Sequence, residues 1–526
     1  MNNRDTGATW AYHDGTKHSW ASVRQGGHHL DWPNRPLPFK VYETLDPIPL
    51  PRQVVGSGMS AVEALALPRT VAARGATLDL TDLPRVLYFS AGITKQLAFG
   101  GGKIYFRAAA CTGALYHIEL YVVCGGVPEL EAGVYHFSVH DFALRRLRAG
   151  DHRRALVEAS GGAPAVAGAP ATLVCTTTFW RNAWKYRARA YRHAFWDGGT
   201  ILANALAVAG SQDLPAQVVL GFADGPVNAL LDLDTEREVA IALLPLGGGA
   251  AQAPEAPPLQ PLGLKTTPVS KREVDYPEVR AMHQASSLAT GAEAAAWRAP
   301  HGRTAGSPVM AGPKGRLFPL PPLDGAALPP EPVEHVVLHR GSTRRFSEEP
   351  ITLGELSIAL RCATSAVPAD FLEAGASLNH LYLIVNAVEG LPPGAYALHR
   401  DQGALELLME GDFRSQAGYL GLEQELPADA AADVFFLADL PPILERFGNR
   451  GYRAAQMEAG ILGGKLYLAA YAQGFGASGL TFFDDDVTEF FSPHAEGKSV
   501  MFLVALGRPA RRLVERGAPV ASTGQS

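Results

Sequence analysis

An internal repeat is the feature of this sequence that most restricts its fold. When the chain is compared with itself at an offset of 261 residues, glycine, tyrosine, arginine and aspartate recur together. The matched pairs are Gly133 with Gly394, Tyr135 with Tyr396, Arg189 with Arg450, Arg192 with Arg453, Phe222 with Phe483, and Asp224 with Asp485. Apolar patterning alone does not align these residue types at one constant shift. We therefore predict two copies of one fold.

A proline-rich segment separates the copies. Residues 248–332 hold 15 of the 39 prolines, and such composition favours extended, weakly packed chain. We predict an N-terminal domain at 1–247 that begins with an irregular leader at 1–75. A linker at 248–332 follows, with one short helix around 292–297, and then a C-terminal domain at 333–526. A linker of this length allows the two domains to dock side by side.

Each copy combines strands with one long helix. Apolar runs at 118–123 and 381–385 have the length of strands, whereas 191–211 and 452–474 are long enough only for helices. Both helices are rich in small residues, and since helix-interior glycine costs stability, this indicates close approach to another backbone. We expect these helices to form the interface between the copies. Strands at 218–221 and 500–506 complete an α+β architecture.

Composition excludes several classes of protein. The chain has 46 Lys and Arg against 52 Asp and Glu, a net charge of −6, which lacks the basic excess that nucleic-acid binding needs. No apolar stretch is long enough for a membrane span, and the N-terminus does not resemble a signal peptide. We expect a soluble, cytoplasmic globular protein.

Neither a metal site nor a reactive cysteine is expected. Cys111, Cys124, Cys175 and Cys362 form no CxxC pair, so a disulfide scaffold or zinc site is not indicated. With no His-Asp set to place beside it, Cys111 is interpreted as a small buried thiol without a covalent role.

Two polar clusters are open to a metal-binding interpretation that their spacing does not favour. His28-His29, with His13 and His18 nearby, matches no familiar ligand spacing, so a surface loop is expected. For Asp484-Asp485-Asp486, turn or helix capping is the better interpretation. Asp485 has a counterpart, Asp224, in the first copy, and a residue kept in both copies suits a structural role at a turn or helix start.

Two strings in the first copy carry a family resemblance. Residues 107–121 read RAAACTGALYHIELY, and residues 181–192 read RNAWKYRARAYR. They resemble R-x-x-P-S-A-G-A-L-Y-P-x-E-L-Y and R-x-x-W-K-Y-x-x-R-x-Y-R of the nitroreductase superfamily, in particular the SagB-type dehydrogenases of azole-containing peptide biosynthesis. The first string departs from the family at Ala110, Cys111, Thr112 and His117, where the family has Pro, Ser, Ala and Pro.

The second copy opens with a string similar to the superfamily's R-x-S-x-R-x-F. The resemblance implies that Arg340, Ser342 and Arg344 hold the phosphate and ribityl chain of FMN, and guanidinium groups suit phosphate geometry. On capping rules alone, Ser342 or Thr343 would instead be a helix N-cap. The further flavin contacts that the resemblance implies are Gln424, Gly479, Leu480, Thr481 and Arg508, the last with Arg511 or Arg512.

The two copies have lost complementary parts of this pattern. In superfamily dimers the cofactor lies at the interface, which implies that Arg107, Ala110, Cys111 and Thr112 contact it from the first copy. At the offset of 261, Lys185-Tyr186 is replaced by Arg446-Phe447 in the second copy, and Gln424 by Ala163 in the first. We therefore predict one FMN per chain in an intramolecular pseudodimer. Further oligomerisation is left open.

The resemblance implies an FMN-dependent oxidoreductase that dehydrogenates an azoline in a ribosomal peptide natural product to an azole. Lys185 would be the base and Tyr186 a hydrogen-bond donor or relay. Without the resemblance, the same residues would be interpreted as a solvated basic and aromatic stretch. A peptide or small heterocyclic substrate, oxygen as electron acceptor and partner biosynthetic enzymes are implied as well. The alternatives are an NAD(P)H-dependent nitro, quinone or enone reductase, another flavin-dependent oxidation in natural-product biosynthesis, and a non-enzymatic scaffold in which one copy binds a leader peptide or a partner enzyme.

Overall fold

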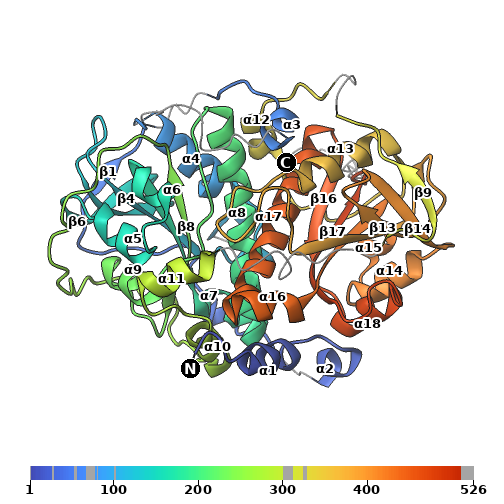
Figure 1. Ribbon diagram of the computed structural model, residues 1–526, viewed down its shortest axis with the longest axis horizontal. Helices are drawn as coiled ribbons and strands as arrows, with labels where there is room; N and C mark the ends of the chain where they lie inside the picture. Colours follow the sequence, from blue (N-terminus) through green and yellow to red (C-terminus); the bar gives the residue numbers. More distant parts are fainter. Residues whose placement is uncertain are drawn as a thin grey trace, which may run out of the picture.

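The computed structural model contains two α+β domains side by side, each built around one antiparallel sheet (Figure 1). It describes residues 2–25, 29–51, 56–66, 78–79, 81–99, 102–299, 312–323 and 328–510. The first sheet contains β1 (Pro47–Pro49), β4 (Ile118–Cys124), β5 (Gly133–Ser138), β6 (Ala143–Ala149), β7 (Ala171–Thr178) and β8 (Glu238–Leu246), in the order β1-β6-β5-β4-β7-β8. The predicted α+β architecture is confirmed.

The second sheet repeats this arrangement and adds one strand, at a single edge. It contains β9 (Arg316–Pro319), β11 (Asn379–Val385), β13 (Gly394–His399), β14 (Ala404–Glu410), β15 (Ala432–Ala438), β16 (Gly476–Leu480) and β17 (Ser499–Gly507), in the order β16-β17-β15-β11-β13-β14-β9. Two small sheets, β2 (Ile93–Phe99) with β3 (Gly102–Arg107) and β10 (Ile351–Thr352) with β12 (Val388–Glu389), lie outside them.

Helices cover these sheets and join the domains. Those of the first half are α3 (Ala61–Ala66), α4 (Asp82–Ala91), α5 (Arg153–Ala159), α6 (Pro164–Gly168), α7 (Phe179–Tyr186), α8 (Ala190–Ser211) and α9 (Asp224–Leu230). Those of the second are α12 (Val333–His339), α13 (Leu353–Thr364), α14 (Arg414–Leu420), α15 (Glu425–Asp429), α16 (Leu440–Phe447), α17 (Arg450–Ala472) and α18 (Asp484–Phe490). Short 3₁₀ turns occur at Trp32–Asn34, Thr112–Ala114 and Arg187–Arg189. Among the described helices, none is both long and apolar enough to cross a membrane.

The offset of 261 residues holds for most elements but slips by one near the end of the repeat. The bounds of α5 and α14, and those of α7 and α16, correspond at 261. Just after α8 the offset is 260. Val219 bridges Leu243 in the first sheet, and the equivalent pair in the second sheet is Gly479 with Val504. Phe222 and Asp224 therefore correspond to Phe482 and Asp484, and the predicted match to Phe483 and Asp485 is wrong by one residue.

The long helices α8 and α17 lie side by side at the centre of the molecule, which confirms the predicted interface (Figure 1). Glycine is required at their crossing. A Cβ on Gly199 would lie 2.6 Å from the backbone of Gly460, and a Cβ on Gly464 would lie 2.6 Å from the Cβ of Ala203. The small residues of both helices thus allow the two backbones into contact.

Each long helix is also tied to the opposite domain by a buried aspartate, in a two-fold related arrangement. The four ion pairs are Arg189–Asp484 at 2.9 Å, Arg192–Asp484 at 2.6 Å, Arg450–Asp224 at 2.7 Å and Arg453–Asp224 at 2.7 Å. Asp484 is the first residue of α18, and the N-cap residue before it is Phe483. Residues 484–486 form the first turn of α18, in agreement with the predicted helix start, but Asp484 also accepts from arginines across the interface.

The N-terminal leader begins with two helices that were not predicted, whereas its described residues 35–46 are mostly irregular, as expected. Helices α1 (Gly7–Gly15) and α2 (Trp20–Gln25) lie beneath the second domain, beside α18 (Figure 1). Thr9 Oγ1 donates to Asn449 at 2.6 Å, and His13 Nδ1 lies 3.2 Å from the Tyr452 hydroxyl. His13 is buried, which corrects the surface loop expected for it. These tertiary contacts explain a helix that local sequence did not predict; His28 lies outside the described residues.

The described part of the segment between the domains is more ordered than its composition predicts. The helix expected around 292–297 is confirmed as α11 (Gly291–Arg298), but α10 (Pro277–Ala285) and strand β9 were not predicted. β9 pairs with β14 at the edge of the second sheet. The predicted strand at 218–221 is reduced to bridges, because Val218 turns toward the second domain and pairs with Ala369.

Candidate functional site

A cavity of about 370 Å³ lies between the domains and gathers most of the residues that the sequence predicts. From the first domain it is lined by Ala110, Cys111, Thr112, Lys185 and Tyr186. From the second it is lined by Ser342, Arg344, Gln424, Gly479, Leu480 and Thr481. Strings more than 150 residues apart in the sequence therefore meet at one site that neither domain forms alone.

Three of the predicted arginines do not line this cavity. Arg340 donates to the backbone carbonyls of Arg107 and Ala108, so its guanidinium fastens the two domains together. Arg107 donates to the carbonyls of Pro38 and Ile118. Arg508 pairs with Glu355 at 2.7 Å; Arg511 and Arg512 lie outside the described residues.

Residues 341–350 form no helix, so Ser342 and Thr343 are not helix N-caps. Ser342 Oγ lies 3.2 Å from the hydroxyl of Tyr467, which also accepts from the backbone N–H of Gly479. Arg344 is exposed and has no carboxylate partner among the described residues. This side of the cavity therefore offers a hydroxyl pair and an uncompensated cation.

The loop opposite is shaped by a glycine. Gly113 has φ +60°, a left-handed conformation, and a Cβ there would lie 2.9 Å from the Tyr186 hydroxyl. Both the backbone angle and the close contact favour glycine at this position. The loop at residues 111–114 is thus packed directly against the predicted catalytic tyrosine.

Asp197 of α8 anchors this loop, and sequence reasoning missed it. Its carboxylate accepts from Thr112 N at 2.9 Å, Thr112 Oγ1 at 2.6 Å, Cys111 Sγ at 3.0 Å and His117 Nε2 at 2.8 Å. A signal existed in the sequence, because Asp197 is the one charged residue in the largely apolar stretch 195–210.

These contacts correct the reasoning about Cys111. A His-Asp pair does lie beside it, contrary to the expectation from sequence. However, burial and the Asp197 carboxylate raise the pKa of the Cys111 thiol well above its ordinary value. The thiol donates a hydrogen bond to Asp197 and stays protonated, whereas a nucleophilic cysteine needs a lowered pKa.

Lys185 and Tyr186 end helix α7 at the cavity. Partial burial, with the charges of Arg344 and Arg35, lowers the pKa of Lys185. Burial, with Asp197 and Cys111, raises the pKa of Tyr186. Lys185 Nζ lies 5.2 Å from the Tyr186 ring centroid, and no carboxylate pairs with it in the part of the chain that is described. The arrangement offers an amine that loses its proton more readily than usual, beside a neutral phenol.

The cavity walls suit a flavin with an anionic tail. The ring centroids of Trp196 and Phe502, which both line the cavity, lie 5.1 Å apart. Thr481 Oγ1 is buried there without a hydrogen-bond partner among the described residues. An aromatic wall, unsatisfied polar atoms and the unpaired Arg344 together fit the ring, ribityl chain and phosphate of FMN.

The two-fold related position, by contrast, is filled by protein. There Val219–Gly221 replaces Gly479–Thr481. The Asp370 carboxylate accepts from the backbone N–H groups of Leu220 and Gly221, both at 2.8 Å. Trp297 of α11 donates to the carbonyl of Phe447 at 2.9 Å and packs on its ring at 5.1 Å. Phe447 is the counterpart of Tyr186, so linker and loop residues occupy the surroundings of a second site.

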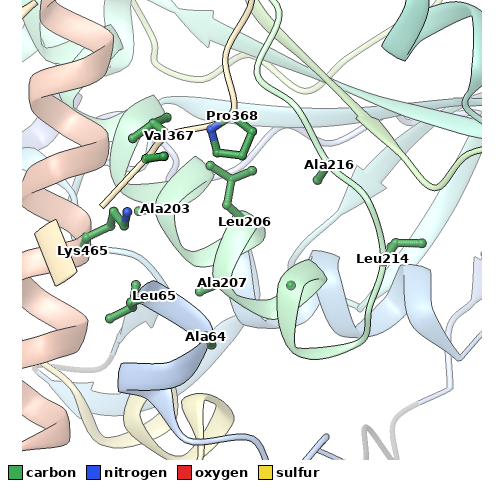
Figure 2. Close-up of a pocket in the computed structure, with 12 residues that line it drawn as sticks. Ala64, Leu65, Ala203, Leu206, Ala207, Leu214, Ala216, Val367, Pro368 and Lys465 are labelled. Atoms are coloured by element: carbon green, nitrogen blue, oxygen red, sulfur yellow. The ribbon is translucent and has the colours of Figure 1, made fainter. Parts of the chain in front are cut away.

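A smaller cavity of about 40 Å³ lies between α3, α8 and α17. Figure 2 shows Lys465 reaching from α17 toward alanine and leucine side chains of α8. Burial lowers the pKa of Lys465 to about 8, and its amine donates to Ser365. The volume is too small for a flavin, so this cavity is not a candidate cofactor site.

Comparisons with known proteins agree with this architecture. The model described as "Nitroreductase family" matches residues 337–508. A candidate nitroreductase from Methanocaldococcus jannaschii is 26% identical over 163 residues, which are 30% of this chain and 82% of that protein. The crystal structure of a candidate nitroreductase from Anabaena variabilis is 28% identical with a TM-score of 0.74, and the match covers 96% of this chain and 99% of the other.

A chain of the Escherichia coli microcin synthetase McbBCD complex, solved with truncated pro-MccB17, is also similar in fold. It is 18% identical with a TM-score of 0.30, over 48% of this chain and 95% of its own; likeness at that level does not bear on activity. The match that spans the whole chain shows the nitroreductase fold, and residues 337–508 within it match the nitroreductase family.

Proposed function

We propose that this protein is an FMN-dependent oxidoreductase that dehydrogenates an azoline ring in a ribosomal peptide natural product to an azole. The observation that carries the proposal is the shared cavity: Lys185 and Tyr186 from one domain line it together with Ser342, Arg344 and Gly479 from the other. The SagB-type resemblance of the Trp184-Lys185-Tyr186 string supports the choice of reaction.

The two domains would divide the binding of cofactor and substrate. Ser342 and Arg344 would hold the ribityl chain and phosphate, Gln424 and residues 479–481 would flank the ring, and the 110–112 segment would approach it from the first domain. Bound FMN supplies a hydride acceptor. The protein's own task is then to place the substrate ring and to remove a proton from it.

Lys185 fits the role of base. Aromatisation of an azoline removes a hydride from one ring carbon and a proton from its neighbour, and a Lys185 amine with lowered pKa accepts that proton. Tyr186, whose pKa is raised, stays protonated and donates a hydrogen bond to the ring heteroatom or relays the proton. The Asp197 carboxylate positions the loop beneath them.

Replacement of Lys185 tests this assignment. We expect Lys185→Ala to reduce the azole-forming rate by at least about 100-fold, the usual contribution of a general base, while FMN stays bound. The exposed Lys271, which does not line the cavity, gives the matched control Lys271→Ala with unchanged rate. The measurement is azole formation by mass spectrometry on a thiazoline-containing peptide, with flavin absorbance read in parallel. Unchanged turnover in Lys185→Ala would falsify the assignment.

A second candidate is an NAD(P)H-dependent reductase of nitro, quinone or enone compounds. It is favoured by the Anabaena and Methanocaldococcus relatives, which are both described as nitroreductases. Rapid oxidation of NAD(P)H by the FMN-loaded protein, with no azole formed from azoline peptides, would favour the reductase. A protein that takes up no flavin would instead favour a binding scaffold.

A further inference from the structure

A polar cluster on the second sheet lies apart from the cavity. His399 on β13, Glu406 on β14 and His494 after α18 place their ligand atoms within 4.8 Å of one another. His399 Nε2 lies 2.7 Å and His494 Nε2 lies 3.6 Å from the same oxygen, Oε2 of Glu406. None of these residues lines the cavity between the domains.

Hydrogen bonds fix two of these side chains through the atoms that do not face the cluster. Glu406 Oε1 accepts from the backbone N–H groups of Lys314 and Gly315, at 2.7 and 2.6 Å, which leaves Oε2 directed at the histidines. His494 Nδ1 lies 3.0 Å from the Tyr382 hydroxyl, whose oxygen is also 3.2 Å from the His494 carbonyl. Supporting contacts of this kind fix the orientation of metal ligands.

One ring nitrogen in this cluster is left without a partner. His494 Nε2 is buried and makes no hydrogen bond among the described residues, although it faces a carboxylate. A cross-strand hydrogen bond between His399 and Glu406 explains those two residues as a structural pair. It does not explain the third side chain, which a shared cation would satisfy.

We propose that His399, Glu406 and His494 form a binding site for a late first-row divalent cation such as Zn²⁺. Two imidazoles and one carboxylate are ligands that these metals prefer, whereas Mg²⁺ and Ca²⁺ require more oxygens. With metal–ligand bonds of about 2.0–2.1 Å, tetrahedral ligands lie about 3.3 Å apart. The His494–Glu406 separation is already close to this value, and the His399–Glu406 pair widens by about 0.6 Å on binding.

The chemistry of the site follows from its exposure. His399 and Glu406 are 3% exposed and His494 is 17% exposed, so the cation enters from the His494 side. A water molecule that enters with the cation from that side would complete a tetrahedral set of ligands.

The test is zinc binding by the full-length, flavin-loaded protein after dialysis against a chelator. We expect one tightly bound Zn²⁺ per chain by elemental analysis after ZnCl₂ is added and excess is removed. His494→Gln and Glu406→Gln should each lose it. Tyr382→Phe, which keeps the ring and removes the hydroxyl, should weaken affinity about 10-fold. His335→Gln, at an exposed position on α12, is the matched control and should bind zinc as the unsubstituted protein does.

X-ray absorption at the zinc edge separates this site from the other cluster that could hold a metal, Cys111 with His117 and Asp197. The proposal requires nitrogen and oxygen neighbours at about 2.0–2.1 Å and none at the zinc–sulfur distance of about 2.3 Å. A sulfur neighbour, no bound zinc, or full binding in folded His494→Gln and Glu406→Gln proteins would each overturn it. None of these outcomes depends on the flavin reaction.

Discussion

Gly113 sets the distance between the 111–114 loop and Tyr186. In Gly113→Ala, the new methyl group would lie 2.9 Å from the Tyr186 hydroxyl, so the loop or the tyrosine must shift. We expect azole formation to fall at least about 10-fold, since small misplacements at a reacting centre are costly. The left-handed backbone adds a stability cost of about 1–2 kcal/mol. Turnover and thermal unfolding of the same preparation measure the two effects.

Gly162 provides the control for backbone strain. It has φ +73°, and a Cβ there would meet nothing within 4 Å, so Gly162→Ala carries the same conformational cost without a steric contact. We expect a similar loss of stability and no loss of turnover. Equal turnover in the two variants would show that the Gly113 contact does not position Tyr186.

Individual site residues were predictable where they lie in short local strings. Lys185-Tyr186, Ser342-x-Arg344 and residues 479–481 were predicted from their resemblance to family strings, and the fold brings them to one cavity. Asp197 and Tyr467 were missed because their partners come from distant segments. Arg340 was placed at the cofactor by its motif, yet its guanidinium donates to carbonyls of the other domain.

At the scale of elements, the paired aspartates fasten each long helix to the opposite domain. In Asp484→Asn, Arg189 and Arg192 lose their buried counter-charge, and breaking such a pair costs about 3–5 kcal/mol. Asp485 is 76% exposed on the same helix, so Asp485→Asn should cost less than about 1 kcal/mol. Chemical denaturation of both variants measures this, and equal losses would contradict the one-residue slip in the repeat.

Acid should weaken the same contacts. The arginines lower the pKa of Asp224 and Asp484 to about 2, below the ordinary value of 3.8. A carboxyl with a lowered folded-state pKa stabilises the fold fully above its unfolded pKa and loses that contribution as pH falls through the folded pKa. The melting temperature should therefore fall steeply between about pH 4 and pH 2, and this dependence should be shallower in Asp484→Asn.

The contact between α8 and α17 should tolerate no side chain at its closest point. A Cβ on Gly460 would lie 2.7 Å from the carbonyls of Phe195 and Trp196, so Gly460→Ala should destabilise the protein by about 1–3 kcal/mol or more. On α8, a Cβ on Gly210 would meet only the carbonyl of Ala64 at 3.8 Å. Gly210→Ala should be neutral or stabilising by up to about 1 kcal/mol. Calorimetric melting compares them, and a neutral Gly460→Ala would contradict the backbone contact.

Element prediction succeeded where pattern and packing agree. The two long helices, the strands around 118–123, 381–385 and 500–506, and the linker helix were found from local sequence. Helix α1 was missed because its stability depends on contacts with Asn449 and Tyr452 far along the chain. The strand at 218–221 was overpredicted because its backbone turns to bond the second domain through Ala369 and Asp370.

At the scale of the whole molecule, duplication followed by divergence has made the two interdomain positions unequal. A symmetric dimer of this fold would have two equivalent positions, one on each side of the α8–α17 contact. Here one is the cavity of about 370 Å³. At the other, Asp370 satisfies the backbone N–H groups of residues 220 and 221, and Trp297 packs on Phe447. Of these two interdomain positions in the described part of the chain, one therefore has room for a flavin.

This inequality predicts the flavin stoichiometry. Protein saturated with FMN and freed of excess by gel filtration should release one FMN per chain on denaturation, measured by absorbance against total protein. Arg344→Gln should lower that occupancy, because it removes the unpaired guanidinium of the cavity. Trp297→Ala, which empties part of the second position, should still give one, since Asp370 continues to occupy the N–H groups there and repels a phosphate or flavin oxygen. Two FMN per chain in the unsubstituted protein would mean that Trp297 and Asp370 move aside. The two interdomain positions would then differ in the reaction they support and not in whether they bind flavin.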